Sequence, residues 1–168
     1  MKTLITTKGK ANTGKTTLMW TVYERLVCMT NNKLHGVWTA QGYREIDTPH
    51  SRVYKASGLL DDFSALLSVN GVKIYIASAG DTKKCIDDSI NKGKSYADIV
   101  LITVRIRTRS RIIKVEEFYE TEIKPVYSPI EFVLHKTNDL QQRCDQNNKV
   151  ADSIVSAVMD EINKMNNL

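Results

Sequence analysis

The residues of this chain best suited to chemistry lie close to its start. Residues 9–16 read Gly-Lys-Ala-Asn-Thr-Gly-Lys-Thr and fit the pattern G-x-x-x-x-G-K-[ST] without a mismatch. Gly9 and Gly14 allow backbone angles and close approaches that a Cβ atom would block. The N–H groups of such a loop can therefore point inward and form a concave site for an anion. The pattern predicts a loop that binds phosphate groups.

The side chains of this loop have separate tasks in the predicted site. Lys15 is expected to reach the β- and γ-phosphates of a nucleotide, and the Thr16 hydroxyl is expected to bind Mg²⁺. Thr17 is a further contact near the α-phosphate, although the pattern does not require it. The predicted nucleotide-binding residues are Gly9, Lys10, Ala11, Asn12, Thr13, Gly14, Lys15, Thr16 and Thr17.

The segments on either side of the loop have the character that this chemistry requires. Residues 2–7 are short, β-branched and apolar, which favours a buried strand. Apolar residues recur three and four positions apart from Thr16 to Met29, which predicts a helix. The N-terminus of that helix would add positive potential where the phosphates lie.

With a strand, a glycine loop and a helix in this order, the chain resembles the P-loop NTPase superfamily. The resemblance is carried by eight residues and names a superfamily rather than one protein. It implies an α/β fold of three layers, with a mostly parallel sheet and helices on both faces. It also implies that the chain binds a nucleoside triphosphate, ATP or GTP, with Mg²⁺ and hydrolyses or transfers the γ-phosphate.

The composition is that of one globular domain, which we expect to span residues 1–168. Hydrophobic residues make up 42% of the chain and charged residues 26%. No apolar stretch is long enough to span a bilayer, and no apolar secretory segment follows the first lysine, so we expect no membrane partner. Three widely spaced cysteines favour reduced thiols and a cytoplasmic location.

The formal net charge of +5 favours anionic partners. It does not distinguish a nucleotide from a nucleic acid.

Apolar runs and turn residues further along the chain predict alternating strands and helices. Asn70-Gly71 separates apolar runs at 63–69 and 72–78, which predicts a β-hairpin with a type I′ turn. Residues 98–104 are apolar and β-branched, as is typical of a central strand. We also predict strands at 36–40, 52–56 and 130–134, a loop at 41–51, and helices at 82–95, 112–124 and from about residue 147.

These elements predict a mostly parallel sheet that is joined by one antiparallel hairpin strand. Right-handed crossovers would place the glycine loop at the C-terminal ends of the parallel strands, where ligands bind in open α/β sheets.

A carboxylate near the magnesium is expected at the end of an apolar strand. Here the strand at 72–77 ends in Ala77, and the next acid along the chain is Asp81. If the hairpin is aligned with that of GTPases, Ala77 replaces the usual aspartate. Gly80 would keep the position whose N–H group meets the γ-phosphate.

We therefore predict that Asp81 supports the metal together with Thr16. The alternative is that Asp81 caps the helix that follows. Asp61 and Asp62, in the expected turn before the hairpin, are the weaker candidates for the metal.

Four arginines follow the apolar strand at 98–104: Arg105, Arg107, Arg109 and Arg111. The first of them should lie at the same sheet edge as the glycine loop. Because guanidinium groups stabilise the charge that develops in phosphoryl transfer, we predict catalytic roles for Arg105, Arg107 and Arg109 beside Lys15. The position and composition are similar to those of the arginine-rich lids of small-molecule and nucleotide kinases. A solvated basic loop and a nucleic-acid contact are the alternatives.

The choice of base is weakly specified. GTPases read guanine with Asn-Lys-x-Asp after a late strand, whereas this chain has His135-Lys136-Thr137-Asn138-Asp139. Lys136 is better interpreted as a packing or surface lysine, which favours ATP.

Three functions remain open. The first is a kinase-like enzyme that passes the γ-phosphate of ATP to a small-molecule acceptor or to water; Asp47 and Asp62 are guesses for its general base. The second is a nucleotide-dependent switch in which the loop at 41–51 or the hairpin contacts a protein partner. The third, ranked last, is a nucleic-acid-associated ATPase, because the arginines lack the interleaved aromatic residues of a single-strand platform.

Overall fold

The middle layer of the molecule is a mixed β-sheet. The computed structural model describes residues 1–29, 33–40, 42–44, 51–106 and 113–168. Within them the sheet has seven strands in the order β3-β2-β4-β5-β6-β1-β7. Their bounds are β1 (Thr3–Gly9), β2 (Lys33–Thr39), β3 (Gly42–Arg44), β4 (Phe63–Val69), β5 (Val72–Ala77), β6 (Ile99–Arg105) and β7 (Ile130–Leu134).

One half of the sheet is parallel and the other half is antiparallel. The strands β5, β6, β1 and β7 run parallel to one another, as predicted. The antiparallel hairpin partner of β5 is β4, also as predicted. The sheet extends further than predicted, because β2 pairs antiparallel with β4 and β3 pairs antiparallel with β2.

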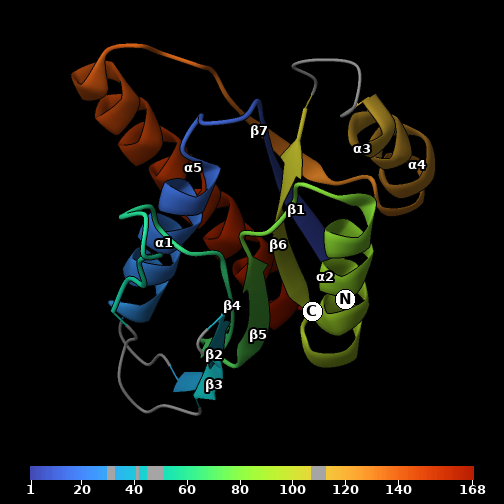
Figure 1. Cartoon of the computed structure of the whole chain (residues 1–168). Helices are drawn as coiled ribbons and strands as arrows, with labels where there is room; N and C mark the ends of the chain where they lie inside the picture. The colour runs from blue at the N-terminus through green and yellow to red at the C-terminus, as the bar shows by residue number, and fades with distance from the viewer. Residues whose placement is uncertain (30–32, 41, 45–50, 107–112) are drawn as a thin grey trace.

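Helices cover both faces of the sheet (Figure 1). One face carries α1 (Lys15–Val27) and α5 (Leu140–Asn166), which pack against each other. The other face carries α2 (Lys83–Tyr96) and a continuous helical segment made of α3 (Ile113–Phe118), a π-helical turn η1 (Tyr119–Ile123) and α4 (Lys124–Tyr127). The α/β class with three layers is therefore confirmed. No helix among the described residues is long and apolar enough to cross a membrane.

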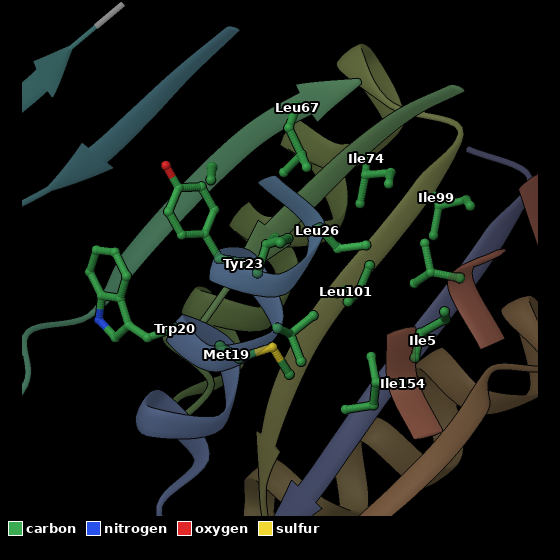
Figure 2. Packing of buried hydrophobic residues seen from close by; sticks show 14 of the residues in the cluster. Ile5, Met19, Trp20, Tyr23, Leu26, Leu67, Ile74, Ile99, Leu101 and Ile154 are labelled. Carbon is green, nitrogen blue, oxygen red and sulfur yellow. The ribbon is translucent and has the colours of Figure 1, made fainter. Parts of the chain in front are cut away.

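The larger core lies between the sheet and the pair α1 and α5. Figure 2 shows Met19 on α1 and Ile154 on α5 close to Ile5 and Leu101 on the central strands. At one end of this core the Trp20 ring stacks on Phe63, with ring centroids 3.8 Å apart. This packing fixes the start of α1 against the start of β4, which brings two segments of the candidate site together.

The predicted hairpin is confirmed in its turn and its register. Asn70 and Gly71 both have positive φ, of 49° and 81°, as a type I′ turn requires. Val69 pairs with Val72 next to the turn, and Ser64 pairs with Ala77 at the far end.

The predicted strand at 52–56 and the predicted loop at 41–51 differ from the structure. In the first segment Tyr54 forms only an isolated bridge with Leu60, because the chain turns back at Gly58 with a φ of 80°. In the second, residues 42–44 form β3, an edge strand that pairing with β2 stabilises. Residues 41 and 45–50, which include Asp47, lie outside the described residues.

The C-terminal helix starts earlier than its apolar stripe predicted. It begins at Leu140, where the side chain of Asp139 caps it by accepting a hydrogen bond from the Gln142 N–H at 2.8 Å. The first two turns are polar, so hydrophobic periodicity could not reveal them. The predicted stripe is confirmed by Ile154, Val158 and Ile162, which are fully buried.

The parallel strands end at one edge of the sheet. There the Ile106 N–H donates to the Gly9 carbonyl at 3.1 Å, and the Arg105 N–H donates to the Gly80 carbonyl at the same distance. The predicted placement of the glycine loop and Arg105 at a common edge is therefore confirmed.

Candidate functional site

The loop between β1 and α1 has the backbone that its glycines predicted. Asn12 and Gly14 have positive φ, of 58° and 87°. A Cβ atom on Gly9 would lie 2.5 Å from the Thr13 hydroxyl, so a larger residue would displace the loop. The Thr13 hydroxyl donates to the Lys10 carbonyl at 3.0 Å and closes the turn. Gly14 begins α1 without a side-chain cap, which leaves N–H groups at the helix start for another acceptor.

Lys15 lies inside this loop with only 8% of its surface exposed. Its ammonium group donates to the carbonyls of Gly9 at 3.0 Å and Lys10 at 2.8 Å. Burial lowers the pKa of Lys15, and the charge of Arg105 lowers it further, while Asp81 and Asp62 partly oppose the shift. The net lowering means that the ammonium lacks a full countercharge, which an anion in the loop would supply.

Thr16 meets an acid that was only a weaker candidate from the sequence. Its hydroxyl donates to Asp62 Oδ1 at 2.9 Å. The Ser78 hydroxyl donates to the same oxygen at 3.0 Å and accepts from the Phe63 N–H at 2.9 Å. Asp62 Oδ2 has no hydrogen bond with another described residue. The carboxylate is thus held at one oxygen, and the other stays available.

Asp81, the predicted metal ligand, lies on the wall of the same cavity and is mostly exposed. It pairs with Arg105 at 3.5 Å. It does not cap α2; Thr82 does, by accepting from the Cys85 N–H at 3.1 Å, so that alternative is wrong. Two acids therefore lie near the loop, with Asp62 bonded to Thr16 and Asp81 paired with Arg105.

Gly80 has a packing role that the sequence did not reveal. A Cβ atom there would lie 1.9 Å from the Thr103 carbonyl oxygen, so only glycine lets the chain lie against β6.

The predicted arginine cluster is described only at its beginning. Arg105 ends β6 and lines the cavity, and its Nε is buried without a hydrogen-bond partner among the described residues. Arg107, Arg109 and Arg111 fall within residues 107–112, outside the described residues. The structure therefore places one predicted catalytic arginine at the loop.

The C-terminal helix contributes two residues that sequence analysis missed. Arg143 lines the cavity and donates from Nη2 to the Thr137 carbonyl at 3.0 Å, while its Nε is buried without a partner in the described chain. Asn147 is 7% exposed, and its Oδ1 is likewise buried and unpartnered. Its amide nitrogen lies 3.1 Å from the position of a Cβ on Gly14. The sequence did hold one indication of Asn147, because this polar residue lies on the same helical stripe as the buried Ile154.

Most of these residues line a cavity of about 650 Å³, although Gly9, Gly80 and Asn147 are not part of its lining. This volume falls within the range of pockets that hold small molecules. A short turn before the hairpin supplies Lys55, Leu59 and Leu60 to its wall. The remaining lining residues are Ala11, Asn12, Thr13, Gly14, Lys15, Thr16, Thr17, Asp62, Ser78, Asp81, Arg105 and Arg143.

Lys136 is exposed and is not among these lining residues, in agreement with its interpretation as a surface lysine.

The donors around Thr16 are a hydroxyl and two carboxylates, which are oxygen ligands of the kind that magnesium accepts. Among the described residues no group of three or more His, Cys, Asp or Glu is placed to hold a metal. Magnesium differs, because it usually keeps several waters and binds through one or two carboxylates plus substrate phosphates. The Thr16 hydroxyl and the nearby acids Asp62 and Asp81 fit that requirement.

Comparisons of the chain with protein-family models, with curated proteins and with solved structures gave no match. The function is therefore argued from the residues and the geometry of this site.

Proposed function

We propose that the chain is a P-loop protein that binds a nucleoside triphosphate, in the first place ATP, with Mg²⁺, and hydrolyses or transfers its γ-phosphate. The observation that carries this proposal is the hydrogen bond from Thr16 to Asp62 beside the buried Lys15. These are the hydroxyl, the acid and the cation that phosphoryl transfer requires, and one cavity contains all three.

The loop and the start of α1 would hold the phosphates. Positive φ at Asn12 and Gly14 supports a concave loop backbone, and no side chain caps the start of the helix, so N–H groups there would be free to bind phosphate. Lys15 would neutralise the β- and γ-phosphates in place of the carbonyls that it now contacts.

Thr16, Asp62 and Asp81 would hold the magnesium. Because the Thr16 hydroxyl donates its proton to Asp62, the lone pairs of that hydroxyl remain available to a cation. At these residues magnesium would supply positive charge against the negative charge that develops in phosphoryl transfer.

Arg105 would stabilise charge on the transferred group. Its Nε is buried without a partner at the sheet edge, next to the exposed Asp81. A positioned guanidinium in a site that excludes water is the type of group that stabilises such a transition state. Arg143 would contact the nucleotide from α5.

A nucleotide-dependent switch is the second candidate, and the turn before the hairpin favours it. Lys55 and Leu59 both line the cavity, and Leu59 is 67% exposed. A ligand could therefore reorder this turn and change an apolar surface that a protein partner contacts.

The nucleic-acid alternative depends on arginines 107–111, outside the described residues. Free cysteines at 28, 85 and 144 support the proposed cytoplasmic location.

Calorimetry with ATP and GTP, each with Mg²⁺, tests the proposal. We expect ATP to bind, and Lys15→Ala to weaken binding and to slow phosphate release by about 10³-fold, because the cation inside the loop is lost. Lys136→Ala is the matched control, since it removes an exposed lysine outside the cavity. Absence of binding of any triphosphate by the folded chain would refute the proposal.

A further inference from the structure

A second cavity, of about 270 Å³, lies beside the first. Among the described residues, Asp62 is the one that lines both cavities. The second cavity is formed by β2, β4, β5 and α2, whereas the first is formed around the glycine loop. A molecule in the second cavity would therefore reach the phosphate site at Asp62.

One wall of the second cavity is aromatic. Trp38 and Tyr75 lie edge to face, with ring centroids 6.4 Å apart and an angle of 60° between the rings. Tyr75 is buried and packs edge to face against Trp38, so its position is fixed. A rigid aromatic wall of this kind favours a planar ring as the ligand.

The opposite wall is polar and belongs to α2. It presents Asp88, Ser89 and Lys92. Asp88 and Lys92 form no ion pair with another described residue, which leaves a carboxylate and an ammonium available at the rim. The cavity therefore offers hydrogen-bonding groups of both kinds to a ligand whose ring lies on the aromatic wall.

Two small residues keep this space open next to Asp62. Ala77 ends β5, and Ala79 follows two residues later; both line the cavity. Ala79 is only partly buried, so a longer side chain there would fill the cavity without disturbing the core.

We propose that the second cavity binds the phosphoryl acceptor, and that the acceptor is a nucleoside. The inference rests on the function proposed above. A nucleoside combines a planar base with ribose hydroxyls, and its size suits a cavity somewhat smaller than those of drug-sized ligands. The base would lie against Trp38 and Tyr75, with a hydroxyl toward Asp62.

The transfer step follows from this placement. The acceptor oxygen forms a bond to the γ-phosphorus while the bond from that phosphorus to the β–γ bridging oxygen breaks. The nucleoside diphosphate leaves, and the hydroxyl proton passes to a water molecule and from there to bulk solvent, since Asp62 is placed to hold the magnesium. The products are a nucleoside monophosphate and a nucleoside diphosphate.

Ligand-observed NMR with adenosine, guanosine, cytidine and uridine tests the acceptor site. The chain is first saturated with a non-hydrolysable ATP analogue and Mg²⁺, so that nucleosides report on the second cavity alone. We expect at least one nucleoside to bind, and we expect ³¹P NMR to show its monophosphate when ATP replaces the analogue. Binding of none of the four to the loaded chain would overturn the inference.

Ala79→Leu is the blocking variant. It should weaken nucleoside binding by about tenfold or more, since a leucine occupies the ligand's space. Affinity for the ATP analogue, measured by calorimetry, should not change. Cys85→Phe fills the same cavity from α2 and serves if Ala79→Leu does not fold.

Unchanged nucleoside binding in the folded blocking variant would also overturn the inference. If the wild-type chain does not bind the analogue in calorimetry, the proposed function itself fails, and the two failures are thereby distinguished.

Discussion

Two polar clusters flank the central strand β1, and they differ in how far the chain itself satisfies them. On the side of η1 and β7, Glu131 accepts from Tyr119 at 2.8 Å and pairs with Lys8 at 2.9 Å and Lys124 at 3.0 Å. Tyr119 in turn contacts Thr6 at 2.7 Å. On this side the charged groups have partners within the chain.

At the cavity the balance is different. Arg105, Arg143 and Asn147 each bury a polar atom that has no partner among the described residues. Such atoms are costly to leave unpaired, and the ligand proposed above would pair them. The comparison teaches that the Glu131 cluster is satisfied within the chain, whereas the cluster at the loop leaves polar atoms that the proposed nucleotide would pair.

Among the changes that separate these two clusters, the largest effect should come from Asp62, the acid that the tertiary structure brings to Thr16. We expect Asp62→Asn to lower magnesium-dependent phosphate release by about 10²-fold, because the amide still accepts from Thr16 but carries no charge. Asp81→Asn, the matched change at the other acid, should cost about tenfold. Titrating turnover against magnesium concentration compares the two variants. A larger loss of phosphate release in Asp81→Asn than in Asp62→Asn would show that Asp81 is the main carboxylate for the magnesium, as predicted from the end of the strand.

The Glu131 cluster should act on stability and leave binding unchanged. Burial opposes ionisation of Glu131, but hydrogen bonds from Lys8, Lys124 and Tyr119 outweigh it and lower its pKa to about 2. The ionised form is therefore favoured by folding. Its contribution is present above the ordinary pKa of 4.5 and is lost as the pH falls toward about 2.

We expect Glu131→Gln to lower the free energy of unfolding at pH 7 by about 2 kcal/mol, and wild type and variant to converge near pH 2. Denaturant titrations across this range measure the difference. Glu122→Gln is the control, since its ion pair with Lys83 is exposed and should contribute almost nothing. Weaker ATP binding in Glu131→Gln would contradict the prediction that this cluster affects stability alone.

The smallest effects should come from Asn147, where one substitution is expected to change both stability and ATP binding. Asn147→Leu removes a buried, unpartnered oxygen, so we expect the free energy of unfolding to rise by about 1 kcal/mol. The same change should raise the Kd for ATP several-fold, since the amide lies against Gly14. Asn163→Leu, at an exposed position of the same helix, should do neither. A variant that is more stable and binds ATP as well as wild type would show that Asn147 has no part in binding.

Much of the fold could be read from local patterns. The hairpin followed from Asn70-Gly71, because few residues adopt two consecutive positive φ angles without strain. The central strand β6 followed from its apolar run. The start of α5 and the edge strand β3 did not, since a polar helix end and a three-residue strand depend on a cap and on pairing.

The hairpin register also held information about the acid. Ser64 pairs with Ala77, so the residues just before β4 lie beside those just after β5. Following the hairpin pairs outward from the Asn70-Gly71 turn would have placed Asp62 beside the end of β5, where a carboxylate near the magnesium is expected. The prediction ranked Asp62 below Asp81 because it considered only the end of a parallel strand, whereas β4 is antiparallel and begins at that edge.

By itself the sequence determined the glycine loop, because close approach and positive φ are properties of single residues and their immediate neighbours. It also determined the strand before the loop and the helix after it. Only the tertiary structure decided which distant groups surround the loop. Asp62, Arg105 and the α5 residues Arg143 and Asn147 come from three segments whose meeting depends on strand order, hairpin register and the packing of α5 on α1. No local pattern encodes those contacts, since they arise when separate apolar faces are buried together.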